Sequence, residues 1–201
     1  MKKIIEIVIV LIVGIFLFMY FKPVKITNYP SKGDSIVMFG DSLIYGVGST
    51  SGNDMATLIS NEIGEPVINM GVPGETSAQG LLRINDVIEK NPKVVFILFG
   101  GNDFLHKIPL ANTFKNIDNM VVEIQKSGAV VILLGIQGGV LTDPYDTEFE
   151  KIVKKRGTLH VTNVLGGLIG NREFMSDAVH PNDAGYRKIV DRILPVLRKG
   201  R

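Results

Sequence analysis

The chain has 201 residues, with 22 Lys and Arg against 20 Asp and Glu, giving a formal net charge of +2. The basic residues are scattered and form no run that could follow a phosphate backbone, so we expect no nucleic-acid partner. The chain contains no Cys, which excludes disulfides, thiolate nucleophiles and thiolate metal ligands. Behind an apolar N-terminal run, the remaining length suits one domain.

The first predicted element is this apolar run. Residues 4–21 contain a single charged residue, Glu6. As a helix rising about 1.5 Å per residue, the run spans roughly 27 Å, close to the hydrocarbon thickness of a bilayer. It ends in the large side chains FLFMYF, where a cleavable signal peptide has small ones. We therefore predict an uncleaved transmembrane helix, the membrane anchor, over residues 1–22, in preference to a buried core helix.

The orientation of this anchor is less clearly encoded. Lysines flank the apolar run on both sides, so the positive-inside rule hardly separates the two orientations. A short basic head, Lys2 and Lys3, before an apolar run resembles an export signal. We therefore predict a single-pass, membrane-anchored protein whose folded domain is extracytoplasmic, either periplasmic or extracellular.

A linker and then a domain of alternating strands and helices follow. Residues 23–34 are polar and broken by two prolines and a glycine, which predicts a linker, and the domain then covers 35–201. Five short runs that are apolar at nearly every position predict strands covered on both faces by helices. These runs are residues 35–39, 66–70, 94–99, 129–134 and 159–164.

Helical patterns separate the predicted strands. They cover residues 54–63, 76 or 77 to 90, 113–126, 147–156 and 184–199. The repeated alternation of strand and helix is typical of an α/β protein with right-handed crossovers. The predicted fold is a three-layer αβα sandwich with a five-stranded parallel sheet.

Four segments beside the predicted strands and the last helix carry reactive or flexible residues. They are Gly40–Leu43, Asn69–Gly74, Gly100–Asp103 and Asp177–Asn182. Because open parallel sheets place their functional sites at the carboxyl ends of the strands, we expect all four segments to meet at one edge.

Together these segments contain every group that acyl transfer from an ester requires. Ser42 stands where a strand gives way to a loop and is the candidate nucleophile. His180 is the candidate base, and Asp177 can accept a hydrogen bond from its second ring nitrogen. The backbone N–H groups of Ser42 and Gly71 and the side-chain amide of Asn102 are candidate donors to the oxyanion.

The four segments resemble the sequence blocks of the SGNH or GDSL hydrolase superfamily, in the family's order. Gly40–Leu43 reads as its GDSL block, Gly71 matches the glycine of the second block, and Asn102 matches the asparagine of the third. Asp177 and His180 match its DxxH block. The resemblance implies a flavodoxin-like three-layer fold and hydrolysis of esters or thioesters without metal or cofactor. The family's substrates range over lysophospholipids, acyl thioesters, aryl esters and acetylated sugars.

The predicted function is that of a membrane-anchored serine esterase acting on small-molecule or lipid acyl esters. An O-acetylesterase acting on carbohydrate or peptidoglycan, of the same superfamily, is one alternative, and a non-catalytic membrane-tethered binding domain is another. A metal-dependent phosphoesterase is disfavoured because the chain has only three His. Two of them, His106 and His160, are predicted to be structural, and Asp103 is predicted to brace the loop of Asn102.

Overall fold

The computed structural model describes residues 25–137 and 144–201. The predicted membrane anchor at residues 1–22 lies outside them. Among the residues that are described, no helix is both long enough and apolar enough to cross a bilayer.

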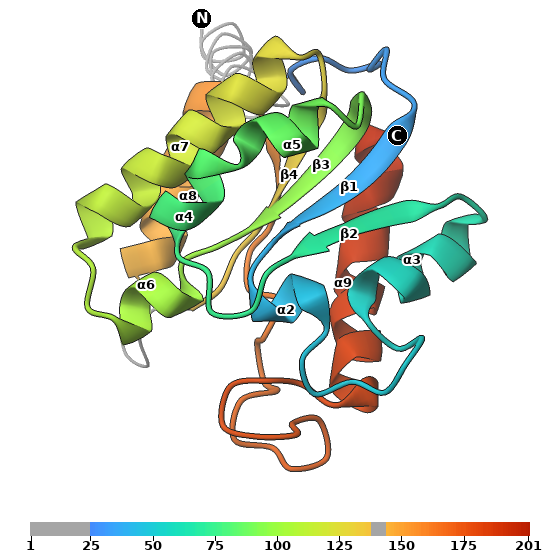
Figure 1. Ribbon diagram of the computed structural model, residues 1–201, viewed down its shortest axis with the longest axis vertical. Helices are drawn as coiled ribbons and strands as arrows, with labels where there is room; N and C mark the ends of the chain where they lie inside the picture. The colour runs from blue at the N-terminus through green and yellow to red at the C-terminus, as the bar shows by residue number, and fades with distance from the viewer. Residues whose placement is uncertain (1–24, 138–143) are drawn as a thin grey trace, which may run out of the picture.

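The described chain forms an α/β sandwich around one parallel sheet (Figure 1). The sheet has five strands in the order β2-β1-β3-β4-β5, every pair parallel, as in flavodoxin-like folds. The strands are β1 (Ser35–Gly40), β2 (Val67–Gly71), β3 (Pro92–Leu98), β4 (Val130–Leu134) and β5 (Leu159–Val161). The predicted α/β fold with a five-stranded parallel sheet is therefore confirmed, although β5 is shorter than the apolar run that predicts it.

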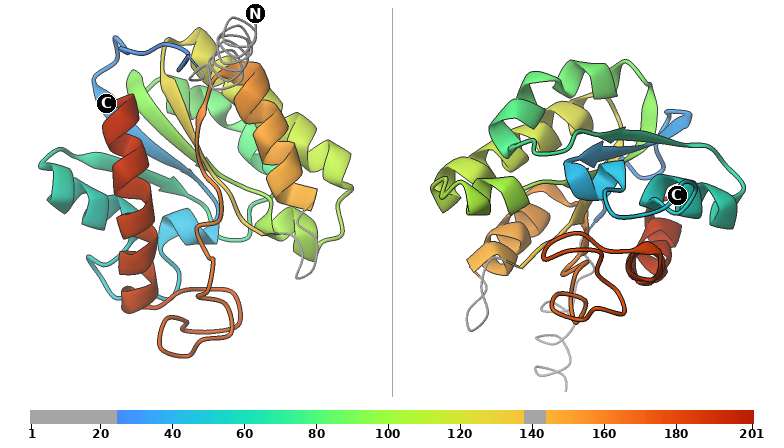
Figure 2. Two further views of the ribbon diagram at one scale, coloured as in Figure 1. Left: turned by 180° about the vertical axis from the view of Figure 1, so that it is seen from behind. Right: turned by 60° about the horizontal axis from the view of Figure 1, so that its bottom comes forward.

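Helices cover both faces of the sheet (Figures 1 and 2). On one face α3 packs against α9, and on the other α7 packs against α4, α5 and α8. The short helices α2 and α6 lie at the carboxyl ends of β1 and β3. The helices are α2 (Ser42–Tyr45), α3 (Met55–Ile63), α4 (Ser77–Leu82), α5 (Ile84–Ile88), α6 (Gly101–Leu105), α7 (Leu110–Lys126), α8 (Pro144–Arg156) and α9 (Asp183–Gly200).

Burial of the apolar strands explains why this order of elements is stable. Every residue of β4 is buried, as are all residues of β1 after Ser35. Burying a large aliphatic or aromatic side chain stabilises a fold by about 1.5–3 kcal/mol, so each central strand is a strong source of stability. The sheet is thus a rigid base whose carboxyl edge can hold loops in fixed positions.

The C-terminal part of the segment predicted as a linker makes contacts with the domain. From Thr27 onward the segment lies along the N-terminal edge of the sheet and is hydrogen bonded to the domain. Thr27 N–H donates to Gly157 O at 2.9 Å, and Asn28 Nδ2 donates to the carbonyl oxygens of Gln125 and Ala129 at 2.7 and 3.0 Å. Ser31 Oγ donates to a further carbonyl oxygen in the α7–β4 turn at 3.1 Å. We call residues 25–34 the strap.

Candidate active site

Ser42 is the first residue of α2, directly beyond the carboxyl end of β1. Asp41 caps this helix, since its Oδ1 accepts the N–H of Leu43 at 3.0 Å. Because α2 has only four residues, this cap fixes the direction of the turn that carries Ser42. The Ser42 hydroxyl consequently projects toward the loop that follows β5.

His180 reaches Ser42 from that loop, 138 residues further along the chain. The distance between His180 Nε2 and Ser42 Oγ is 3.0 Å. On the other side of the ring, His180 Nδ1 lies 2.7 Å from Asp177 Oδ2. The three side chains therefore form one continuous hydrogen-bonded chain.

Asp177 is held by its own loop as well as by the imidazole. Its Oδ1 accepts the N–H groups of Val179 and His180 at 2.8 and 2.7 Å. The hydrogen bond from the His180 side chain, followed by these two backbone N–H groups, lowers the pKa of Asp177 to about 2. Asp177 is thus a carboxylate at any pH at which an esterase works, and it favours the tautomer of His180 that leaves Nε2 free to accept a proton.

Asn102 stands at the start of α6, beyond the carboxyl end of β3. Its Nδ2 donates to Glu75 O at 3.0 Å and, more weakly, to Asp41 Oδ2 at 3.3 Å. Burial raises the pKa of Asp41 to about 7, although the Leu43 N–H and the nearby His180 oppose the rise. Asp41 therefore links α2, the helix that carries Ser42, to the side-chain amide of Asn102.

The two glycines of the segment after β2 have different surroundings. A Cβ on Gly71 would lie 2.1 Å from Tyr45 N, so glycine is required there for β2 to pack against α2. Its N–H donates to Asn69 Oδ1 at 3.0 Å, and Gly71 does not line the cavity beside Ser42. Gly74 does line that cavity, at a φ of 78°, which favours glycine. The structure therefore brings Gly74 to the site in place of Gly71, the residue expected from the sequence.

Two buried polar clusters hold the loops that carry Gly74 and Asn102. Asp103 accepts the N–H and the hydroxyl of Ser77 at 2.8 and 2.5 Å, which joins α6 to the start of α4. Glu75 forms an ion pair with Arg83, whose guanidinium also donates to Met70 O at 2.9 Å. Arg83 stands between α4 and α5, where the sequence predicts one continuous helix. The sequence predicts such a bracing role for Asp103, whereas no local pattern indicates one for Glu75 or Arg83.

The other two histidines lie outside this chain of contacts. His106 is exposed at the end of α6. His160 belongs to β5 and stacks on Phe149 with ring centroids 5.4 Å apart. Among the described residues, no group of three or more His, Asp or Glu side chains could hold a metal ion.

A cavity of about 750 Å³ opens beside Ser42 at the carboxyl edge of the sheet, the edge that faces the reader in the right-hand view of Figure 2. Ser42, Asn102 and His180 line one part of it. Most of the remaining wall is apolar, formed by Leu43, Val47, Phe104, Leu105, Ile136, Leu165 and Ile169. A nucleophile at the end of an apolar cavity suits a substrate that carries a hydrocarbon chain on its acyl group.

This fold and this site define a hydrolase whose hydroxyl, imidazole and carboxylate lie at the carboxyl edge of a parallel sheet. Residues 38–188, more than half of the chain, match the GDSL-like Lipase/Acylhydrolase family. The chain belongs to this family and is a serine-dependent carboxylic ester hydrolase.

Named relatives agree with this family. Esterase TesA of Pseudomonas aeruginosa is 27% identical over 180 residues, which cover 84% of this chain and 90% of the relative. An arylesterase of Vibrio mimicus is 26% identical over 178 residues, 83% of this chain and 89% of the relative. Among solved structures, TesA matches with a TM-score of 0.78 at 26% identity, covering 84% of this chain and all of TesA. The SGNH-hydrolase family esterase AlinE4 matches with a TM-score of 0.64 at 27% identity, covering 84% and 98% of the two chains.

Proposed function

We propose that the protein hydrolyses acyl esters with Ser42 as nucleophile, His180 as general base and acid, and Asp177 as the group that orients His180. The 3.0 Å contact between His180 Nε2 and Ser42 Oγ carries this proposal. A base within hydrogen-bonding distance of the hydroxyl is the requirement for activating serine, and a mere binding domain has no need of it.

The reaction then proceeds in two halves. Ser42 Oγ attacks the ester carbonyl carbon while His180 Nε2 takes the hydroxyl proton, and the imidazolium that forms is stabilised by the Asp177 carboxylate. His180 returns the proton to the leaving alcohol, which leaves an acyl group on Ser42. Water, deprotonated by the same nitrogen, attacks the acyl carbon and releases the acid, and the proton returns to Ser42.

For the oxyanion hole we propose the N–H groups of Ser42 and Gly74 and the Nδ2 of Asn102. Among the described residues, neither backbone N–H has an acceptor within hydrogen-bonding distance, so both are free to bind a developing negative charge. Gly71, the donor expected from the sequence, already donates to the Asn69 side chain. The long 3.3 Å contact from Asn102 to Asp41 is the one that an oxyanion can displace at little cost.

The cavity favours an acyl group longer than acetyl. An acetyl group fills only a small part of about 750 Å³, and the apolar wall gains free energy only when a chain covers it. This observation favours a lipase-like or thioesterase-like acylhydrolase over the O-acetylesterase alternative. We further propose that residues 1–22 anchor the enzyme in a membrane, with the catalytic domain of residues 35–201 outside the cytoplasm.

Covalent labelling tests the nucleophile. A fluorophosphonate probe should label the wild-type chain at Ser42 in a one-to-one ratio, as determined by peptide mass spectrometry, and Ser42→Ala should remain unlabelled. Ser49→Ala, in the loop after α2, serves as the matched control and should label like the wild type. Labelling of Ser42→Ala, or none in the wild type, would refute the serine mechanism.

A series of p-nitrophenyl esters tests the acyl preference. We expect kcat/KM to rise from the acetyl ester to esters of medium chain length, because each buried CH₂ contributes about 0.8 kcal/mol. A maximum at acetyl would favour the O-acetylesterase instead.

A further inference from the structure

The strap determines how far the catalytic domain can stand from a membrane anchor. The strap is hydrogen bonded to the α7–β4 turn, to the α8–β5 turn and, through Tyr29, to the carbonyl oxygen of Arg201 at the C-terminus. From Lys22, the end of the proposed anchor, to Thr27, the first described residue that is hydrogen bonded to the domain, the chain makes five residue-to-residue steps. Five residue-to-residue steps span at most about 18 Å.

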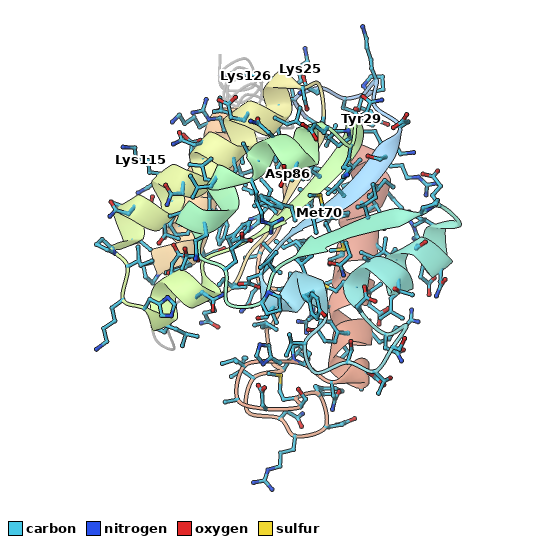
Figure 3. All side chains as sticks on the ribbon, in the orientation of Figure 1. Lys25, Tyr29, Met70, Asp86, Lys115 and Lys126 are labelled. Carbon is cyan, nitrogen blue, oxygen red and sulfur yellow. The ribbon has the colours of Figure 1, made fainter. Side chains whose placement is uncertain are left out.

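The strap and the catalytic cavity lie at opposite edges of the sheet. Figure 3 labels Lys25, Tyr29 and Lys126 at the top of the molecule, whereas α2 and α6, which flank the cavity, lie in its lower part. The strands span the distance between the two edges. The seven residues of β3 alone cover about 23 Å at 3.3 Å per residue.

The edge with the strap also carries unpaired positive charge. Many cations of this edge are bound to acidic side chains: Lys126 to Glu123, Lys154 to Glu150, and Lys155 and Arg156 to Asp118. The strap and the C-terminal end of α9 contain four exposed cations that have no acidic partner within ion-pair distance among the described residues. Asp34 is the acidic residue of the strap. These four cations are Lys25, Lys32, Arg198 and Lys199.

Helix-dipole compensation accounts for only part of this charge. Basic residues in the last turn of a helix stabilise the helix C-terminus, and Arg198 and Lys199 can do so for α9. Lys25 and Lys32 belong to no helix. An anionic lipid surface is the partner whose charge complements all four cations, and it is the surface nearest to a chain that leaves a membrane at Lys22.

We propose that this face, consisting of the strap and the C-terminal ends of α7, α8 and α9, is the surface that docks on an anionic bilayer. The proposal rests on the membrane anchor proposed above. The catalytic cavity then opens away from the bilayer, more than 20 Å above it by the length of β3. The enzyme consequently acts on esters presented from the aqueous side, and acyl chains still embedded in its own membrane are out of reach.

Site-specific fluorescence tests this orientation, and the absence of Cys makes single labelling sites simple to introduce. The full-length chain is reconstituted in vesicles of phosphatidylcholine and phosphatidylglycerol that contain a lipid with a spin-labelled headgroup. A fluorophore is attached to Lys126→Cys on the strap edge or to Arg172→Cys on the loop beside the cavity; both side chains are exposed. We expect most of the fluorescence at position 126 to be quenched and little at position 172. The proposal would be overturned by equal quenching at the two positions or by no quenching at either. Stronger quenching at 172 would also overturn it, because it would mean that the apolar rim of the cavity docks instead.

Two further variants separate the tether from the charge. A flexible Gly/Ser insertion of about 12 residues between positions 24 and 25 adds roughly 20 Å of reach, so hydrolysis of a vesicle-embedded ester should rise several-fold while hydrolysis of a soluble ester stays the same. If hydrolysis of the vesicle-embedded ester does not increase, the short connection to the anchor does not limit the reach of the catalytic domain.

Lys25→Glu combined with Lys199→Glu should weaken the quenching at 126 in anionic vesicles only. Lys115→Glu, an exposed lysine on the side of α7 (Figure 3), should leave it unchanged, and equal effects of the two charge changes would refute the basic face.

Turnover of a soluble ester in the same vesicles keeps the two proposals distinct. If turnover is absent while the quenching pattern is as expected, the proposed esterase function fails and the orientation stands. If turnover is normal and the quenching pattern is not, the orientation fails and the esterase function stands.

Discussion

The two edges of the sheet end the same five strands, but they are held by different kinds of contact. At the N-terminal edge, Thr27 and Asn28 of the strap bind backbone carbonyl oxygens of neighbouring turns. At the carboxyl edge, Ser42, His180 and Asp177 bind one another through their side chains. Contacts to the backbone stabilise the fold, whereas the side-chain contacts leave reactive atoms facing the cavity. Substitutions at the two edges should therefore affect different properties, stability at one and turnover at the other.

The largest expected effect is that of His180→Ala. Without a base to take the Ser42 proton, kcat/KM should fall by about 10³-fold or more in the hydrolysis of p-nitrophenyl butyrate. The melting temperature should fall only modestly, because the ring loses two hydrogen bonds at a partly exposed position, those with Ser42 and Asp177. His106→Ala, an exposed histidine, is the control and should keep wild-type turnover. A variant at position 180 that retains a tenth of the activity would refute the assigned base.

Asn102→Ala should come next, since it removes one donor to the oxyanion. Loss of such a donor lowers kcat by about 10²–10³-fold and leaves KM nearly unchanged. Steady-state kinetics measure both parameters. As a matched control, Asn116→Ala removes an amide that donates to Ser77 Oγ and does not line the cavity, so its kcat should stay close to the wild-type value. A change confined to KM at position 102 would assign this amide to substrate binding only.

Asp177→Asn should lower kcat less than loss of the base does, because the imidazole remains in place but its favoured tautomer is no longer enforced. The same carboxyl gives a pH effect on stability. Its pKa is lowered in the folded state from 3.8 to about 2 by the His180 hydrogen bond and two backbone N–H groups, so it stabilises the fold above pH 4 and this contribution is lost as the pH falls toward 2. Chemical denaturation at pH 5 and pH 2.5 should show that the stability advantage of the wild type over the variant is clearly smaller at the lower pH. A stability difference that persists unchanged at pH 2.5 would contradict the lowered pKa.

Local patterns were sufficient to predict the fold and the meeting of Ser42 with His180. Continuous apolar runs identify buried parallel strands, and a parallel sheet brings the segments beyond its carboxyl ends to one edge. The choice between Gly71 and Gly74 could not be made in this way, because both are glycines of one segment. Only the three-dimensional packing shows that Gly71 is needed for contact with Tyr45 and that Gly74 faces the cavity.

The contacts of the strap could not be predicted from the sequence for a related reason. Its prolines and polar residues are typical of a flexible segment. Its partners, however, are carbonyl oxygens far away in the sequence, such as Gly128 O, which is 97 residues from Ser31, and Arg156 O, which is 129 residues from Thr27. Hydrogen bonds to distant backbone atoms leave no trace in local sequence, since every residue offers the same carbonyl group.

Asp41→Asn should change turnover and stability in opposite directions. Asparagine caps a helix as well as aspartate does, so α2 keeps its start, but an amide nitrogen facing Asn102 Nδ2 cannot accept its hydrogen bond. With Asn102 less well positioned, we expect kcat to fall by about tenfold. Burial raises the pKa of Asp41 to about 7 in the folded state, so the wild type loses stability as the pH rises from about 4 to 7, and the variant lacks this loss. Thermal melts at pH 5 and pH 8 should show the variant gaining stability relative to the wild type at the higher pH; a relative loss would contradict the charged, buried carboxyl.

The smallest effect on turnover is expected at the opposite edge, with Asn28→Ala. Asn28 donates two hydrogen bonds to carbonyl oxygens and has a φ of 65°, which asparagine tolerates better than alanine. Loss of both bonds, at about 1 kcal/mol each, should lower the free energy of unfolding by about 2 kcal/mol. Because the sheet separates the strap from the cavity, kcat and KM for p-nitrophenyl butyrate should stay at wild-type values below the melting temperature. Urea denaturation and steady-state kinetics on the same preparation measure both quantities, and a fall in kcat with an unchanged free energy of unfolding would show that the two edges are coupled through the sheet.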